Sequence, residues 1–360
     1  MLLHVFNPEH DLALAAGLAP YTPPASARQM AADLQLLPRL WAAPGDVILL
    51  ADGGLRRVAE NDADAGGAVD ASVLAEVSGV MPWGWDASVV RRLRQAGVPP
   101  ALLPAEAWLS AFRAATGRAT AMRVLTTLKT SPLLAPWQGA IVGEATRCDS
   151  TDAARAAYPG YMIFKQPWSG SGRGLRPSAP PHTDPQTEAW LRRTLRTQGY
   201  VMAEPLYNKV QDVAAEFWRH PDGSVTFQGL SVFSTTAGGV YDGNLVAAEP
   251  EKRRHLAELI DLDVLDAAIR ALTLTLEAEM AHLDRQMPAT ADAGWPAAYS
   301  GPIGVDMMIV EGRRLHPCVE INFRMTMGFV ALALAQRRLE LHGTLFNIRC
   351  RNGRYVAGSS

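Results

Sequence analysis

Acidic, amide and guanidinium side chains recur at every second position late in the chain. Glu320, Asn322 and Arg324 stand two residues apart in a strand-like segment, so their side chains share one face. Carboxylate and amide oxygens are hard ligands that suit Mg²⁺, and a guanidinium holds an anion in a planar fork. Asp306 lies in an otherwise apolar run, where a buried carboxylate needs a partner or a metal. The pattern predicts a metal and anion site; the alternative is a structural ion pair of Arg324 with Glu320 or Asp306.

A glycine-rich loop follows a strand-like segment in the middle of the chain. Residues 161–165 end in Lys165, and the loop continues to Gly174. Glycines accept positive φ and let consecutive N–H groups turn inward around an anion. The spacing is neither that of a Walker loop nor that of a dinucleotide fingerprint. We interpret the segment as a phosphate cradle, and a mobile surface loop is the alternative.

A third polar cluster lies between two strand-like segments. One strand ends in Glu204, the chain bends at Pro205, and Asp212 follows in a charged strand. Either acid taken alone could be an ordinary surface residue. The cluster gains meaning only together with the other two.

Composition excludes several classes of protein. The chain has 360 residues, 48% hydrophobic and 19% charged, with a net charge of −2. This length accommodates two or three domains and a large core. The charge provides no basic field for nucleic acid, and no apolar run reaches membrane-spanning length. The first residues lack the pattern of a leader peptide. The three cysteines (Cys148, Cys318 and Cys350) suggest no disulfide framework, so we expect a protein of the reducing cytoplasm. From the charge and the apolar runs we also expect that it binds neither nucleic acid nor membrane.

The first 110 residues resemble a parallel α/β unit. Strand-like runs alternate with helical patterns, which favours parallel strands joined by helices. The expected strands are 2–6, 46–50 and 101–103, and the expected helices are 25–40 and 88–96.

The rest of the chain reads as an α+β body, because hairpins and helices are mixed in it. The expected hairpins are 212–233 and 302–323, and the expected single strands are 161–165 and 199–204. The expected helices are 119–128, 185–197, 255–283 (one helix or two) and 328–341.

Two further polar segments could contribute to a site. Residues 7–11 follow the first strand, where α/β sheets bind ligands; they form part of a pocket or cap a helix. Tyr241 and Asn244 lie in a glycine-rich segment after another strand, which is either a substrate contact or a plain loop.

The three clusters, in this order, resemble the ATP-grasp superfamily over about residues 116–335. The resemblance implies an α/β plus α+β fold, in which a parallel α/β domain (1–115) precedes two lobes (116–200 and 201–350) that clasp ATP. It implies a carboxylate–amine or carboxylate–thiol ligase that uses ATP and Mg²⁺ or Mn²⁺. The partners would be a small-molecule carboxylate and an amine, and a homodimer is left open.

The resemblance also implies roles in binding the nucleotide. Lys165 resembles the lysine on the phosphates, with a catalytic role, and Glu204, the backbone at Leu206 and Asp212 resemble the adenine hinge and the ribose-binding acid. The loop that closes over the phosphates corresponds to Ser169, Gly170, Ser171, Gly172 and Gly174.

The remaining roles concern the metal and the reacting groups. Asp306, Glu320 and Asn322 resemble the Mg²⁺ ligands, and Arg324 resembles the catalytic arginine that steadies the acyl phosphate. Ala119 stands where the family usually has its first phosphate-binding lysine, so Arg118 is the expected substitute, with Arg123 as the alternative.

Two other functions fit parts of this pattern. A phosphotransferase should carry a phosphohistidine or a second acceptor domain, and no such segment is apparent. A non-catalytic nucleotide-binding module should have lost metal ligands, and all three candidates are intact. The sequence therefore favours a ligase.

Overall fold

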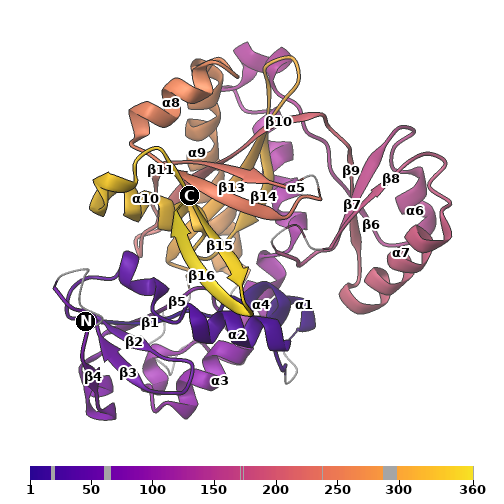
Figure 1. The fold of residues 1–360 in the computed structure, drawn as a ribbon. Coiled ribbons are helices and arrows are strands. Elements are labelled where there is room, and N and C mark those ends of the chain that lie inside the picture. The colour runs from indigo at the N-terminus through magenta and orange to yellow at the C-terminus, as the bar shows by residue number, and fades with distance from the viewer. Residues whose placement is uncertain are drawn as a thin grey trace.

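The structure is a computed structural model that describes residues 1–17, 21–60, 66–170, 172, 174–236, 238–286 and 298–359. Three β-sheets and the helices packed on them form the described part of the chain (Figure 1). Among the helices in these ranges, none is both long and apolar enough to cross a membrane.

The first sheet has the order β4-β3-β2-β1-β5. Its centre is parallel, as predicted: β1 (Leu2–Val5) pairs with β2 (Val47–Leu49) and β5 (Gly79–Pro82). Two short strands, β3 (Leu55–Arg57) and β4 (Ala68–Val69), extend it in antiparallel fashion.

The strand predicted at residues 101–103 is wrong. Residues 100–102 form the 3₁₀ helix η3 (Pro100–Leu102), and β5 takes the third parallel position. Pro99 and Pro100 lack the backbone N–H that a strand ladder requires.

The helices of this unit are short. The helix predicted over 25–40 ends early, because α2 (Ala25–Asp33) stops and only η1 (Leu37–Leu40) follows, with Pro38 in its first turn. The other helical segments are α1 (His10–Ala16), η2 (Ala71–Glu76), α3 (Ala87–Gln95) and α4 (Glu106–Ala115).

A buried polar network fixes the start of α1. Asn7 Nδ2 donates to the Gly84 carbonyl oxygen at 2.8 Å and to Asp86 Oδ2 at 3.0 Å. The other oxygen of Asp86 caps α3 by accepting from the backbone N–H groups of Ser88 and Val89. Asn7 therefore does not cap a helix; it ties the end of β1 to the start of α3 and so positions α1.

The second sheet is small and antiparallel, with the order β6-β9-β7-β8. Its apolar side packs on α6 (Thr151–Ala156) and α7 (Pro185–Gln198) through residues such as Phe164 and Leu191. This unit stands apart from the large sheet at the right of Figure 1. Its strands are β6 (Thr146–Cys148), β7 (Met162–Lys165), β8 (Leu175–Ser178) and β9 (Val201–Pro205).

The third sheet is the largest, with the order β14-β13-β10-β11-β12-β15-β16. Both predicted hairpins are confirmed, as β10 (Lys209–Arg219) with β11 (Val225–Thr235), and β13 (Gly301–Val310) with β14 (Arg314–Asn322). The other strands are β12 (Tyr241–Val246), β15 (Thr344–Arg351) and β16 (Arg354–Ser359).

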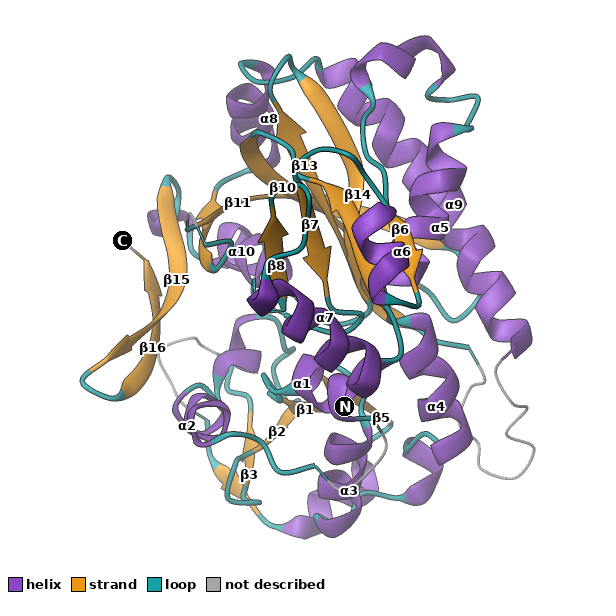
Figure 2. Ribbon diagram, turned by 90° about the vertical axis from the view of Figure 1, so that its right-hand side faces the viewer, coloured by secondary structure: helices purple, strands orange, loops and turns teal. Residues whose placement is uncertain are grey.

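Helices cover the large sheet, and α5 and α9 lie side by side along it (Figure 2). The predicted segment 255–283 falls on two helices, α8 and α9, and the segment 328–341 on α10 and η5. The bounds are α5 (Arg118–Lys129), η4 (Ala135–Ala140), α8 (Glu249–Ala257), α9 (Leu262–Gln286), α10 (Met327–Arg337) and η5 (Leu339–Leu341).

One apolar core joins the first sheet, α4, α5, α9 and the large sheet. We propose the three sheets as the centres of the three expected domains. α5 belongs by sequence to the expected lobe 116–200 but packs on the large sheet, and β9 belongs to the expected lobe 201–350 but pairs within the small sheet. These two elements therefore link the expected lobes.

Replacing Asp86 with alanine should lower the free energy of unfolding by about 2–4 kcal/mol, because a helix cap is lost and Asn7 keeps a buried, unpaired donor. Denaturant unfolding measures this. The control Asp184→Ala removes the exposed cap of α7 and should cost about 1 kcal/mol. Equal losses in the two variants would contradict the anchoring role of Asp86.

Candidate active site

A cavity of about 850 Å³ lies where the three sheets meet. Phe6, Asp11 and Trp83 line it from the first unit, and Lys165 and Glu204 from the small sheet. The large sheet supplies alternate residues of its strands: Asp212, Ala214 and Glu216 from β10, Ser231, Phe233 and Thr235 from β11, and Asp306, Glu320 and Asn322 from β13 and β14. Because side chains alternate between the two faces of a strand, the predicted polar face points into the cavity.

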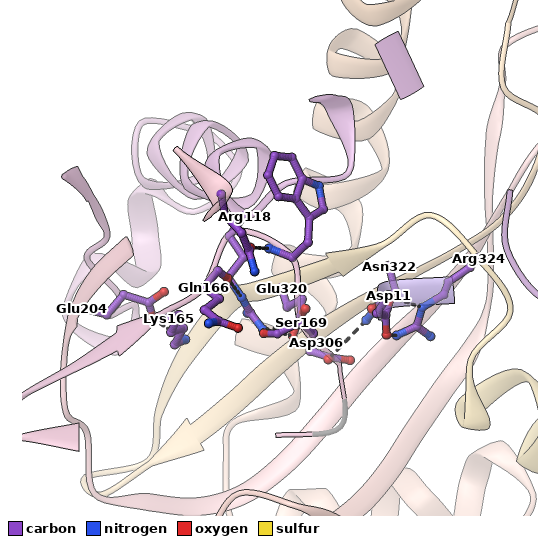
Figure 3. A network of polar contacts seen from close by, with 12 residues as sticks. Asp11, Arg118, Lys165, Gln166, Ser169, Glu204, Asp306, Glu320, Asn322 and Arg324 are labelled. Carbon is purple, nitrogen blue, oxygen red and sulfur yellow. Dashed lines mark hydrogen bonds and ion pairs between the residues drawn. The ribbon is translucent and has the colours of Figure 1, made fainter. Parts of the chain in front are cut away.

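The three predicted metal ligands lie together on this face (Figure 3). Asp306 is directly opposite Glu320 in the sheet, and Asn322 Nδ2 donates to Asp306 Oδ2 at 3.3 Å. Burial, with the nearby charge of Glu320, raises the pKa of Asp306 above its usual range.

A divalent cation would relieve this repulsion, and the amide oxygen of Asn322 would complete a set of hard oxygen donors. No group of three or more His, Cys, Asp or Glu side chains that could hold a metal occurs in the described residues. The candidate site is therefore two carboxylates and one amide.

Lys165 and Glu204 form a buried ion pair, with Nζ 2.5 Å from Oε2. They come from the adjacent antiparallel strands β7 and β9. Both predicted residues line the cavity, and the pair presents the lysine charge to it.

Arg118, rather than Arg123, faces the cavity. Its Nε donates to the Gln166 carbonyl oxygen at 3.0 Å, and its Nη2 lies 2.9 Å from Glu320 Oε2. Arg123 instead pairs with Glu279 on α9 at 2.5 Å. Arg118 is thus a cation held between the small-sheet loop and a candidate metal ligand.

Arg324 pairs with an acid from the other end of the chain. Its Nε and Nη2 donate to the two carboxylate oxygens of Asp11 at 3.0 and 2.9 Å, and Nη1 donates to the Met325 carbonyl oxygen (Figure 3). The sequence-based alternative, pairing with Glu320 or Asp306, is therefore wrong about the partner. Although burial opposes it, the charge of Arg324 lowers the pKa of Asp11. The polar segment 7–11 was the available signal for this residue.

The glycine loop passes tightly between other elements. A Cβ on Gly170 would lie 1.9 Å from Asp11 Oδ2, and a Cβ on Gly172, whose φ is 72°, would lie 1.9 Å from the Gly239 carbonyl oxygen. Both positions therefore require glycine, and both line the cavity.

The other predicted loop residues are less central. Ser169 lines a second, smaller hollow, and its hydroxyl accepts from Arg118 at 3.4 Å. Gly174 has a φ of 69°, and its carbonyl oxygen accepts from the Gln166 N–H. Ser171 lies outside the described residues.

The residues of the predicted hinge line the cavity, and one of their backbone groups is already hydrogen-bonded. Leu206 lines the cavity, but its backbone N–H already donates to the Tyr161 carbonyl oxygen at 3.0 Å. Asp212 lies at the same end and pairs with Lys209 at 2.5 Å. The hinge interpretation at Leu206 thus depends on groups other than this N–H.

Three further polar residues, Tyr241, Asn244 and Glu216, also line the cavity. Tyr241 Oη donates to Asn244 Oδ1 at 2.5 Å, so these two flagged residues bond to each other. Glu216, which the sequence reasoning missed, is buried and accepts from Thr326 Oγ1 at 2.9 Å. Burial raises the pKa of Glu216 to about 8. An acid within the apolar run of β10 was the signal, as it was for Asp306.

Comparison with known proteins shows distant structural similarity only. Protein-family models and curated proteins give no match. Biotin carboxylase from Campylobacter jejuni is 13% identical, with a TM-score of 0.46 over 75% of this chain and 55% of that one. N5-carboxyaminoimidazole synthetase from Staphylococcus aureus with ADP is 14% identical, with a TM-score of 0.43 over 90% and 70%. D-alanyl-alanine synthetase A from Vibrio cholerae is 12% identical, with a TM-score of 0.48 over 95% and 93%.

The chain thus spans just over half of the matched biotin carboxylase, and 20% of the pyruvate carboxylase from Rhizobium etli. The architecture confirms the mixed helix-and-sheet class of the predicted fold: a sheet with a parallel centre precedes two further sheets, and residues of all three units line the cavity.

The raised pKa of Glu216 predicts a pH-dependent stability. Between pH 4.5 and about 8 the folded chain holds a proton that the unfolded chain loses, so the free energy of unfolding should fall as pH rises. Glu216→Gln should make this slope shallower, by at most about 1.4 kcal/mol per pH unit. Denaturant unfolding at pH 5 to 8 measures both slopes. The exposed control Glu258→Gln should leave the slope unchanged, and parallel curves for wild type and Glu216→Gln would refute the assignment.

Proposed function

We propose that this protein is an ATP-dependent ligase that joins a carboxylate to an amine or thiol through an acyl-phosphate intermediate, releasing ADP and phosphate. One observation carries the proposal: two basic residues, two tight glycines, an oxygen-donor set and an arginine fork converge on one cavity. They do so in the chain order of ATP-grasp enzymes. The similar structures include a complex of biotin carboxylase with β,γ-ATP and one of N5-carboxyaminoimidazole synthetase with ADP.

The basic residues suit phosphate binding. Phosphoryl transfer depends mostly on positioning and charge neutralisation. Lys165 and Arg118 line the cavity while each is paired to a single acid, so each keeps N–H groups for a second anion. We assign them to the phosphates of ATP.

The acids of β13 and β14 suit a metal. Asp306, Glu320 and the amide oxygen of Asn322 would hold Mg²⁺ or Mn²⁺, which would neutralise charge between the phosphates and the reacting carboxylate. If Glu320 bound the metal instead of Arg118, the Nη2 group of Arg118 that now pairs with Glu320 would be available to a phosphate oxygen.

Arg324 suits the reacting carboxylate. Asp11 fixes the plane of its fork through two hydrogen bonds, and one N–H on each of Nη1 and Nη2 is left for a substrate. Stabilising charge that develops on the transferred phosphoryl group acts mainly in the transition state.

The glycine loop suits protection of the intermediate. Acyl phosphates hydrolyse readily, so the site must exclude water. The contacts of Gly170 with Asp11 and of Gly172 with Gly239 bring the loop across the cavity.

Three other expectations from the sequence stay predictions: small-molecule carboxylate and amine substrates, a cytoplasmic location and a homodimer.

The test is ADP release over a panel of amino acids and small carboxylates, with hydroxylamine as the trapping amine. Chelation with EDTA should abolish release. Arg324→Lys keeps the charge but loses the fork, so turnover should fall roughly a hundredfold with little change in ATP affinity. The control Arg192→Lys, exposed on α7, should behave as wild type.

A non-catalytic module gives a different result. No carboxylate in the panel would then raise ADP release above background in the wild type. Release that survives EDTA, or that Arg324→Lys leaves intact, would also contradict the proposal.

A further inference from the structure

The acids of the cavity are paired, with one exception. Asp11, Glu204, Asp212 and Glu320 each form an ion pair with an arginine or lysine at 2.5–2.9 Å. Asp306 belongs with Glu320 and Asn322 to the candidate metal site. Among the acids that line the cavity within the described residues, Glu216 alone has neither an ion-pair partner nor a place in the candidate metal site.

The carboxyl group of Glu216 is held in a fixed position. Its residue is 1% exposed, Oε1 accepts from Thr326 Oγ1, and Oε2 has no hydrogen-bond partner among the described residues. A Cβ on Gly304 would lie 2.9 Å from Oε2, and a Cβ on Gly328 would lie 1.9 Å from Oε1. The two glycines thus leave just enough room for the acid.

The nearby cations are committed elsewhere. Lys252 Nζ lies 3.0 Å from Glu249 Oε2 and also donates to the Leu230 carbonyl oxygen. The guanidinium group of Arg324 is paired with the carboxylate of Asp11. Because an unsatisfied buried oxygen costs free energy, a donor brought by a ligand would be favoured at Oε2.

A metal ion is a poor candidate for this place. Thr326 Oγ1 already donates to Glu216 and accepts from the Phe329 N–H. The described residues contain no group of three or more acids, histidines or cysteines that could hold a metal ion. A single carboxylate oxygen is too few ligands for a divalent cation.

The wall beside Glu216 is apolar. Thr326 lies between Met325 and Met327, and the Met325 N–H donates to the Trp83 carbonyl oxygen at 2.8 Å. Trp83 packs edge-on against Phe6, with ring centroids 5.3 Å apart. Apolar residues that line the cavity include Phe6, Met30, Trp83, Met327 and Ile348.

We propose that Glu216 binds the amino group of the second substrate, a primary amine on an apolar body that packs against Phe6, Trp83 and Met327. The inference rests on the proposed ligase function and names the substrate class of the same cavity. A carboxylate oxygen that has no partner and is fixed by Thr326 matches an N–H donor with positive charge, and the apolar wall matches the body that carries it.

Calorimetric titration of the full chain at pH 8 tests this with three probes of similar shape. These are 2-phenylethylamine, the uncharged 2-phenylethanol and the anionic 3-phenylpropionate. The wild type should bind the amine at least tenfold more tightly than the alcohol. Glu216→Gln should weaken amine binding at least tenfold and leave the affinity for the alcohol unchanged. The exposed control Glu258→Gln should behave as wild type.

Three results would overturn the inference: no binding of the amine, equal binding of amine and alcohol by wild type, or unchanged amine affinity in folded Glu216→Gln. The comparison of probes on wild type decides the question even if the variant fails to fold. The amine titration measures binding, whereas ADP release measures ligase activity. If the amine-site inference alone is wrong, ADP release persists while Glu216→Gln leaves amine affinity unchanged. If the ligase proposal alone is wrong, the amine binds through Glu216 while no ADP is released.

Discussion

Negative charge around a partly buried cavity must be neutralised, and the arrangement of this protein depends on that constraint. Each of three cations is held by an acid on another element: Lys165 by Glu204, Arg118 by Glu320 and Arg324 by Asp11. The last two pairs join different units of the fold. Buried ion pairs add little net stability because desolvation offsets the attraction. Their main effect here is to fix where the charges lie.

The same pairs explain how one set of side chains could serve with and without nucleotide. ATP brings anions, to which Lys165 and Arg118 would turn, and this would release Glu204 and Glu320. Glu320 would then face a metal with Asp306. Glu216 differs from these acids because no cation of the described residues pairs with it and its Oε2 has no hydrogen-bond partner among them. That difference is why we assign it to a cationic substrate.

Much of this was predictable because it is local in sequence. Alternation along β14 placed Glu320 and Asn322 on one face, with Arg324 just beyond the end of the strand, and turn residues located both hairpins. The glycines after Lys165 indicated a close approach of backbone, which Gly170 and Gly172 make. Short strands were harder: β5 carries a glycine and a proline in four residues, so its sequence gave no strand signal.

The missed features depend on contacts between distant parts of the chain. Asp11 and Arg324 are 313 residues apart, and Glu216 and Thr326 are 110 residues apart. Arg118 and Arg123 lie one and a half turns apart on α5, so only the packing of α5 between β14 and α9 decides which reaches the cavity. Sequence periodicity indicates a face of an element but not what lies opposite it.

The central claim is that this cavity binds MgATP through Lys165, and calorimetric titration of MgATP tests it most directly. Lys165→Ala should weaken binding by about 1.5–3 kcal/mol, roughly 10- to 150-fold in Kd. The control Lys129→Ala, whose lysine donates to the Gly143 carbonyl oxygen and does not line the cavity, should bind as wild type. Equal affinity of wild type and folded Lys165→Ala, or no binding of MgATP by wild type, would contradict the account.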